Sequence, residues 1–239
     1  MVNVLGHEKP EIPKIKFMDA MNKYGSDKPD LRFELFLESF EDIFAKSEFK
    51  VFSDSLAQGD SLKGLILKGQ AGTVTRKVTD KYTDLVKKYG LKGLVVLKVE
   101  EEGLSGSAAK FISEEEFAAM KAKFNLTVGD VVFIGSGEWE TCCTAIGALR
   151  SALGKDYELI DETQFAYCWV VDFPMFAMEE GVLVARHHPF TAPKPEDYSK
   201  LFTSPKEVRA NAYDLVINGV EIGGGSIRIY DRDMQKDMF

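Results

Sequence analysis

A hairpin signal near the C-terminal end constrains the fold of this chain most. Asn218-Gly219 separates two runs of strand-forming residues, and both residues tolerate the positive φ angles of a two-residue type I′ turn. In the register of such a turn Asp214 faces Gly223, and Asp214 and Glu221 project from the same face, offset diagonally across the two strands. The sequence therefore predicts an antiparallel hairpin that carries two carboxylates on one face.

Three consecutive glycines, Gly223, Gly224 and Gly225, lie on the second strand of this hairpin. Glycines leave room for a ligand to approach the backbone closely. The carboxylates of Asp214 and Glu221 over such a floor suit Mg²⁺, which proteins usually hold with one or two carboxylates plus substrate phosphates. The alternative is a solvated face with a flexible glycine corner, and the residues alone give that alternative about equal weight.

Arg228 follows the glycine run in an otherwise apolar strand. Its guanidinium has the fork geometry that binds a carboxylate through two hydrogen bonds, although a salt bridge on the sheet face is an equally good interpretation. Arg228 and Glu221 are seven positions apart, and an odd separation places two residues of a regular strand on opposite faces. A shared site therefore requires a β-bulge, which we expect between Gly223 and Ser226.

Two histidines, His187 and His188, end a predicted strand that begins at Gly181. Alternation along that strand points the two imidazoles in opposite directions. A histidine at this place can contact an anionic substrate or satisfy a hydrogen bond in the core, and the residues alone favour the structural role. A metal site is less well supported, because no further His or Cys completes a ligand set.

The central part of the chain has the pattern of a compact α+β unit. Apolar residues recur at helical spacing from 74 to 89, and Ser113 with Glu116 predicts a capping box that opens a second helix. After Trp139 a helix over about 141–153 and longer strands are expected. We therefore expect residues near 48–135 to form a separate lobe, with strands predicted at 49–52, 64–67, 94–99 and 131–134.

Composition restricts the classes of protein to consider. The chain has 239 residues, a net charge of −8 and three cysteines without metal-ligand spacing. The acidic balance argues against broad electrostatic binding to nucleic acid, so no DNA partner is expected. No apolar run approaches the roughly 20 residues of a membrane helix, and the N-terminal residues do not resemble a signal peptide. We expect a cytoplasmic protein without a membrane partner.

Three stretches of this chain resemble the bacterial-type aspartyl-tRNA synthetases in residue, order and spacing. They are the segment from Tyr24 to Arg32 (YGSDKPDLR), the segments Trp169–Phe176 (WVVDFPMF) and His187–Lys194 (HHPFTAPK) taken together, and the segment from Tyr213 to Arg228. The part between them resembles the insertion domain of those enzymes, which is shared with the B subunit of the tRNA-dependent amidotransferase.

The resemblance implies an α+β fold in which a partial antiparallel class II synthetase sheet is interrupted by a separate α+β insertion domain. The implied domains are a catalytic segment at 1–40, the insertion domain at 41–140 and a second catalytic segment at 141–239. The implied enzyme is a ligase of protein biosynthesis that activates L-aspartate with ATP and transfers it to tRNA, as a homodimer. No covalent enzyme intermediate is needed, because the reactants are positioned in line.

The resemblance also assigns roles to individual residues. His187 and Arg228 are expected to contact aspartate, Asp214 and Glu221 to hold Mg²⁺ with ATP, and the glycines to form the floor below the nucleotide. The anticodon-binding barrel and the three signature motifs of the family do not occur in this chain, so we expect it to be inactive alone. The alternative hypothesis is a non-catalytic module that binds tRNA or a protein partner.

Overall fold

The computed structural model describes residues 11–179 and 181–238, and these form two compact units. The first unit contains residues 11–20, 27–32 and 162–238, and the second unit contains Met21–Ser26 and Phe33–Asp161. The chain therefore passes between the two units several times. Within the described ranges no helix is long and apolar enough to cross a membrane.

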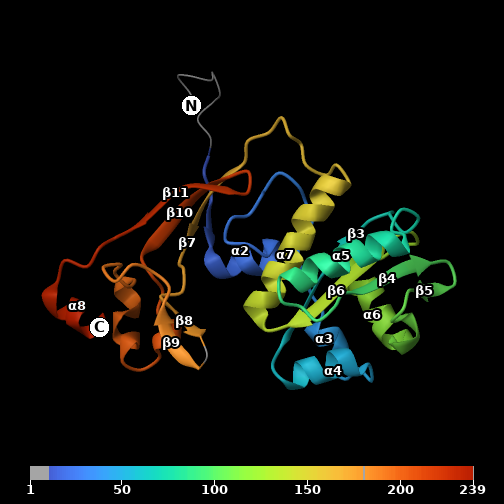
Figure 1. Ribbon diagram of the computed structural model, residues 1–239, viewed down its shortest axis with the longest axis horizontal. Helices are drawn as coiled ribbons and strands as arrows, with labels where there is room; N and C mark the ends of the chain where they lie inside the picture. The colour runs from blue at the N-terminus through green and yellow to red at the C-terminus, as the bar shows by residue number, and fades with distance from the viewer. Residues whose placement is uncertain (1–10, 180, 239) are drawn as a thin grey trace. The chain divides into compact units, whose positions relative to one another are not determined.

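A five-stranded antiparallel sheet forms the middle layer of the second unit (Figure 1). In order across the sheet the strands are β2 (Glu38–Ser39), β3 (Ser61–Leu67), β6 (Val131–Gly137), β4 (Val95–Glu100) and β5 (Gly103–Ser105). The central strand β6 pairs on one side with β3 and on the other with β4.

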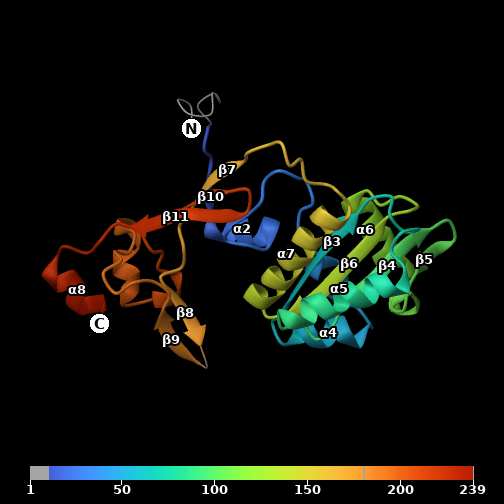
Figure 2. The same cartoon turned by 45° about the horizontal axis from the view of Figure 1, so that its top comes forward.

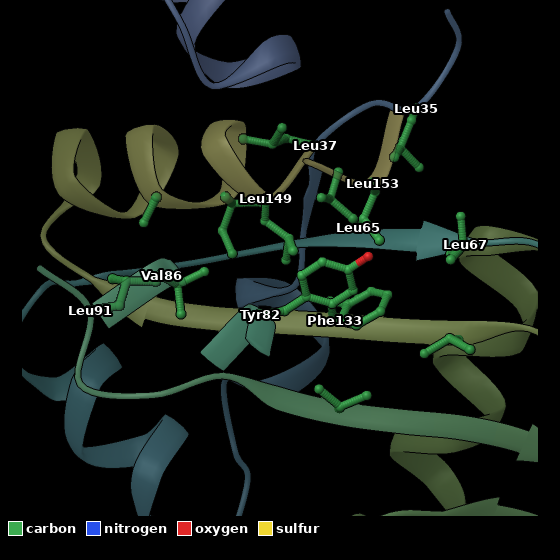
Figure 3. Packing of buried hydrophobic residues seen from close by; sticks show 14 of the residues in the cluster. Leu35, Leu37, Leu65, Leu67, Tyr82, Val86, Leu91, Phe133, Leu149 and Leu153 are labelled. Carbon is green, nitrogen blue, oxygen red and sulfur yellow. The ribbon is translucent and has the colours of Figure 1, made fainter. Parts of the chain in front are cut away.

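Helices cover both faces of this sheet (Figure 2). Alternation along β6 sends Phe133 to a core shared with α5 (Arg76–Lys88) and α7 (Trp139–Asp156), where it meets the ring of Tyr82 at 5.9 Å (Figure 3). Its neighbour Ile134 joins the opposite core. The helices on that face are α3 (Glu41–Phe44), α4 (Lys50–Ala57) and α6 (Glu114–Phe124).

Most of the predicted elements of this unit are confirmed. Ser113 accepts a hydrogen bond from the Glu116 amide, the Glu116 carboxylate accepts one from the Ser113 amide, and this capping box opens α6. The predicted strand at 49–52 is wrong, because these residues begin α4. Phe49 and Phe52 are three positions apart, which places them on one helical face, and Phe52 packs fully buried against Phe44.

The compact units divide the chain at other positions than the expected boundary at 140/141, and the expected domains stay a prediction. Helix α7 continues past Gly154 to Asp156, and its buried residues pack on the sheet of the second unit together with Phe33 and Leu35. The second unit therefore extends to Asp161 and includes part of the segment expected at 1–40. The reason is the apolar face of α7, which has to be buried against a neighbouring layer.

The first unit contains a four-stranded sheet in the order β1-β7-β10-β11. Its strands are β1 (Lys14–Lys16), β7 (Tyr167–Val171), β10 (Ala212–Ile217) and β11 (Val220–Ser226). The pairs β7–β10 and β10–β11 are antiparallel, but β1 runs parallel to β7, so this sheet is mixed rather than purely antiparallel. The α+β class is confirmed.

The remaining elements of the first unit are short. Strand β8 (Phe176–Glu179) pairs with β9 (Val182–Ala185), so the strand predicted to reach His188 ends three residues earlier. Two segments are 3-10 helices, η2 (Pro195–Leu201) and η3 (Pro205–Glu207). Helix α2 (Phe17–Tyr24) has its first four residues in this unit and its last four in the second, and α8 covers Arg232–Met238.

Candidate nucleotide and amino-acid site

The predicted hairpin is present at β10 and β11. Its turn residues Asn218 and Gly219 have φ angles of 51° and 79°, as a type I′ turn requires. The Asn218 side chain also accepts a hydrogen bond from the Ala166 amide at 2.8 Å, which fixes the turn to the segment before β7. Asp214 lies opposite Gly224, one residue later along β11 than predicted.

An extra residue in β11 explains this difference in register. Val216 pairs with Glu221 while its neighbour Leu215 pairs with Gly223, so Ile222 has no partner on β10. The bulge therefore precedes the glycine run instead of lying within it. Strand β11 is the edge of the sheet, where an unpaired residue disturbs only one ladder.

Asp214 and Glu221 lie on the same face, as predicted, and Gly224 separates them. A Cβ atom at Gly224 would clash with the Asp214 carboxylate and would lie 3.3 Å from Glu221 Oε1. A Cβ at Gly223 would meet nothing within 4 Å, and one at Gly225 would lie 3.1 Å from the Tyr213 hydroxyl. Among the three glycines, Gly224 is the one whose missing side chain makes room for the carboxylate pair.

The two carboxylates influence each other. Partial burial, followed by the charges of Glu221 and Asp27, raises the pKa of Asp214 to about 6, and the charge of Lys28 opposes this rise. A cation bound beside Asp214 would stabilise the ionised form of its carboxylate, which the neighbouring negative charges disfavour. The charges around the pair therefore favour binding of a divalent ion.

Lys28 provides the nearest positive charge. Its Nζ lies 3.0 Å from Glu221 Oε2, and the two side chains are 43% and 34% exposed. Hydrogen bonding to Glu221 raises the pKa of Lys28, so the ammonium stays charged at neutral pH. Glu221 thus uses one oxygen for Lys28 while the other, Oε1, is directed to the Gly224 floor.

His187 lies beyond the end of β9, so strand alternation does not determine its direction. The ring Nε2 is 3.2 Å from the carbonyl oxygen of Pro174, and the ring packs edge-on against Phe173 at 5.7 Å. Burial lowers the pKa of His187, which keeps the imidazole neutral at pH 7. These contacts fit the structural role that the residues alone favoured, and they do not test contact with aspartate.

Arg228 lies two residues beyond β11 and forms an isolated antiparallel bridge with Thr191. The Thr191 hydroxyl is 3.1 Å from the Ser226 hydroxyl, which ties this strand to the segment that follows His187. The bulge at Ile222 changes the parity between Glu221 and Arg228, as a shared face requires. The structure brings Asp214, Glu221 and Gly224 together, while a common site with His187 and Arg228 stays a prediction.

A bound metal would need oxygen ligands besides those of the pair. In the part of the chain that the structure describes, no group of three or more His, Cys, Asp or Glu side chains is arranged to hold a metal ion. Two carboxylates nevertheless fit Mg²⁺, because this ion usually keeps waters and substrate phosphates as its other ligands.

Comparison with known proteins identifies the family. The family model for class II tRNA synthetases (D, K and N) matches residues 2–239. The chain belongs to this family. It is 51% identical over 229 residues to the aspartate–tRNA ligase of Halalkalibacterium halodurans, a match that covers 95% of this chain and 38% of the relative.

Two other relatives of this class II synthetase chain show similar coverage. The aspartate–tRNA ligase of Shouchella clausii is 47% identical, with 97% of this chain and 40% of the relative covered. The aspartate–tRNA(Asp/Asn) ligase of Bacillus anthracis is 46% identical, with 95% and 39% covered. The chain thus spans about two fifths of the length of these curated relatives.

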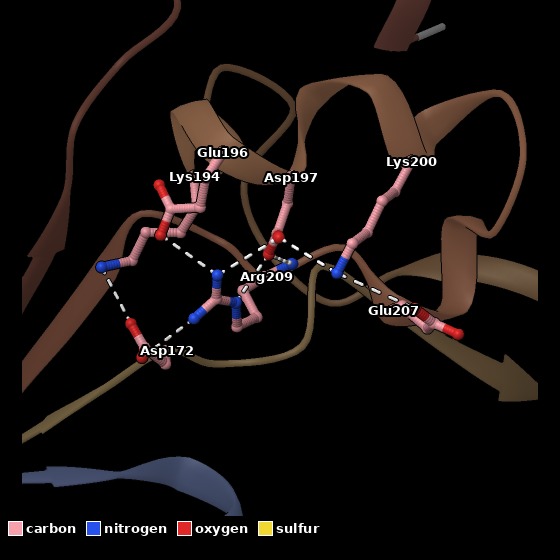
Figure 4. A network of polar contacts seen from close by, with 7 residues as sticks. All are labelled: Asp172, Lys194, Glu196, Asp197, Lys200, Glu207 and Arg209. Atoms are coloured by element: carbon pink, nitrogen blue, oxygen red, sulfur yellow. Dashed lines mark hydrogen bonds and ion pairs between the residues drawn. The ribbon is translucent and has the colours of Figure 1, made fainter.

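Sequence reasoning missed an ion-pair network in the first unit of this synthetase chain (Figure 4). Arg209 Nε lies 2.6 Å from Asp197 Oδ2, and its Nη1 lies 3.4 Å from Asp172, which also binds Lys194 at 2.8 Å. Asp197 is only 1% exposed, and hydrogen bonds from Arg209 lower its pKa to about 2. Lys200 adds a fourth contact, 3.2 Å from Asp197.

This network connects the segments that flank the site. Asp172 follows β7 with a φ of 59°, Lys194 belongs to the segment after His187, and Arg209 precedes β10. Asp172 and Lys194 both occur in segments that carry the family resemblance, which was the available signal. The sequence around Asp197 gave no such signal, because the segments that bring Asp197 to its partner Arg209 are irregular in structure.

Proposed function

We propose that this chain is part of an aspartate–tRNA ligase that activates L-aspartate with ATP and transfers it to tRNA. The observation that carries the proposal is the Asp214–Glu221 pair beside Gly224, because two carboxylates next to a position without a side chain suit Mg²⁺ with nucleotide phosphates. The similarity to aspartate–tRNA ligases, up to 51% identical, supports it.

In this proposal the carboxylates of Asp214 and Glu221 hold Mg²⁺ with ATP. Bound there, the ion would supply positive charge to offset the charge that builds up on the phosphates when aspartate displaces pyrophosphate from the α-phosphate. The glycine run, Gly223 to Gly225, lets the nucleotide approach the backbone. The chemistry is then positioning and charge stabilisation.

His187 and Arg228 are proposed to bind the aspartate substrate. A guanidinium fork at Arg228 selects a second carboxylate over an uncharged amide, because the amide would leave the fork poorly paired. His187 is neutral and fixed by Pro174, so it would contribute a hydrogen bond rather than a charge. The proposed protein is a cytoplasmic homodimer, by analogy with the family.

The isolated chain is expected to bind ATP and aspartate weakly. Glu221 and Arg228 are exposed in the structure, so neither residue lies in an enclosed pocket. Isothermal titration of the chain with Mg·ATP tests this, and an affinity in the micromolar range would contradict it. Aspartate-dependent pyrophosphate exchange by the chain alone should be undetectable.

Variants of the carboxylate pair test the site itself. Binding of Mn²⁺, followed by loss of the free-ion electron paramagnetic resonance signal, should weaken in Asp214→Asn and Glu221→Gln. The matched control is Glu207→Gln, an exposed carboxylate of the same unit. Equal Mn²⁺ binding by all four proteins would refute the proposed site. Binding of tRNA in a gel shift by wild type and both pair variants alike would favour the non-catalytic module instead.

A further inference from the structure

We propose that Lys28 is a phosphate-binding residue of this nucleotide site, held on Glu221 while the site is empty and transferred to the nucleotide phosphates when Mg·ATP binds. The inference rests on the proposed function. It assigns a role to the loop of residues 27–32, which has no role in that function so far.

The two carboxylate oxygens of Glu221 have different neighbours. Oε2 binds the ammonium of Lys28 at 3.0 Å, while Oε1 faces the position above Gly224 that the Asp214 carboxylate also borders. Lys28 therefore contacts the carboxylate pair through the Glu221 oxygen other than the one that borders Gly224. A phosphate chain bound to a metal on this pair would extend within the range of a flexible lysine side chain.

The loop that carries Lys28 is fixed at its far end. Arg32, whose side chain is 10% exposed, binds Asp30 at 2.7 Å and Glu162 at 3.2 Å. Asp30 also packs on the hairpin turn, since a Cβ at Gly219 would lie 3.2 Å from the Asp30 Cβ. The backbone of the loop is thus held beside the hairpin while the Lys28 side chain stays 43% exposed. Such a lysine can exchange partners without movement of the backbone.

The loop also belongs to the unit that carries the site. Residues 27–32 cluster with the first unit, whereas the stretches on both sides of them, Met21–Ser26 and the segment from Phe33, belong to the second. The chain therefore leaves the second unit for six residues. Within them Lys28 contacts Glu221, Asp30 packs on the hairpin turn and Arg32 binds Glu162.

Charge explains why the contact has to change. The hydrogen bond to Glu221, followed by the charges of Asp27, Glu221 and Asp214, raises the pKa of Lys28, so three carboxylates attract its ammonium. A divalent cation on the pair repels an ammonium bound to the same carboxylate. The triphosphate brings new negative charge for that ammonium. Lys28 should accordingly oppose binding of the metal alone and support binding of the metal–nucleotide complex.

The test compares Lys28→Met with wild type in two titrations of the 239-residue protein. Mn²⁺ alone, followed by electron paramagnetic resonance, should bind about threefold or more tighter to Lys28→Met, because the competing charge is gone. Mg·ATP, followed at millimolar concentration by ³¹P line broadening, should bind about threefold or more weaker, because a phosphate contact is lost. Lys28→Arg should restore both values toward wild type. Lys206→Met, a change at an exposed lysine of the same unit, should alter neither.

The outcomes separate this proposal from the proposed function. Opposite changes for Mn²⁺ and Mg·ATP support the transfer of Lys28, since a general loss of structure would weaken both ligands. Weakening of both, or no change in either, overturns it. If Glu221→Gln abolishes Mn²⁺ binding while Lys28→Met has no effect, only the role of Lys28 fails. If wild-type protein binds neither ligand, the proposed site and the role of Lys28 both fail for this chain.

Discussion

Asp214 lies directly opposite Gly224 in the antiparallel ladder of β10 and β11, and a side chain at Gly224 would collide with its carboxylate. The atom in collision is the end of a side chain, which can rotate away. We therefore expect Gly224→Ala to fold with a small loss of stability but to displace Asp214 and weaken Mn²⁺ binding about tenfold. Gly223→Ala is the matched comparison, because its Cβ meets open space. Equal Mn²⁺ affinity of the two variants would contradict the arrangement.

The raised pKa of Asp214 predicts a dependence of stability on pH. The folded protein holds the proton of Asp214 up to about pH 6, whereas the unfolded chain releases it near pH 4. The contribution of this group is therefore fully present below about pH 4 and is lost as pH rises through about 6. Urea denaturation of wild type and Asp214→Asn across this window should give curves that diverge, with wild type losing more stability as pH rises. Parallel curves would argue against the raised pKa.

Arg209 compensates the buried charge of Asp197. Arg209→Met leaves that carboxylate buried without its main partner, and we expect the first unit to lose about 3 kcal/mol of unfolding free energy. Urea denaturation in a Trp139→Phe background measures this, because Trp169 in β7 then reports on the first unit. Arg232→Met, at an exposed position of α8, is the control and should change stability by less than about 0.5 kcal/mol. A comparable loss in both variants would show that the network contributes little.

Gly25 combines a positive φ of 68° with close packing against α7. A Cβ there would collide with the Cys143 carbonyl and the Gly147 backbone, neither of which can move without distorting the helix. Gly59 also has a positive φ, 82°, but a Cβ there meets nothing within 4 Å.

Alanine at either position costs about 1–2 kcal/mol of backbone strain, and Gly25→Ala should cost about 3 kcal/mol more. Fluorescence of Trp139 in a Trp169→Phe background reports the unfolding of the second unit. If the two alanine variants are equally stable, helix α7 and residues 21–26 do not pack as closely as the structure shows.

Several elements could be predicted from the sequence because they depend on interactions between neighbouring residues. The Asn218-Gly219 turn, the capping box of Ser113 and the placement of Asp214 and Glu221 on one face each depend on neighbouring residues, whose conformational preferences act over a few positions. The strand predicted at 49–52 failed because a short aromatic run has no clear period, and packing of Phe52 against Phe44 selected the helix.

The sequence by itself determined the hairpin, the pair of acids on one face and the family of the chain. Tertiary structure decided that the bulge lies at Ile222, that Lys28 binds Glu221 and that Arg209 compensates Asp197. The physical reason is the separation along the chain of the residues that interact. Turn and cap preferences are properties of a few consecutive residues, whereas an edge-strand register and a buried ion pair depend on which distant segments pack together and on the desolvation that this packing imposes.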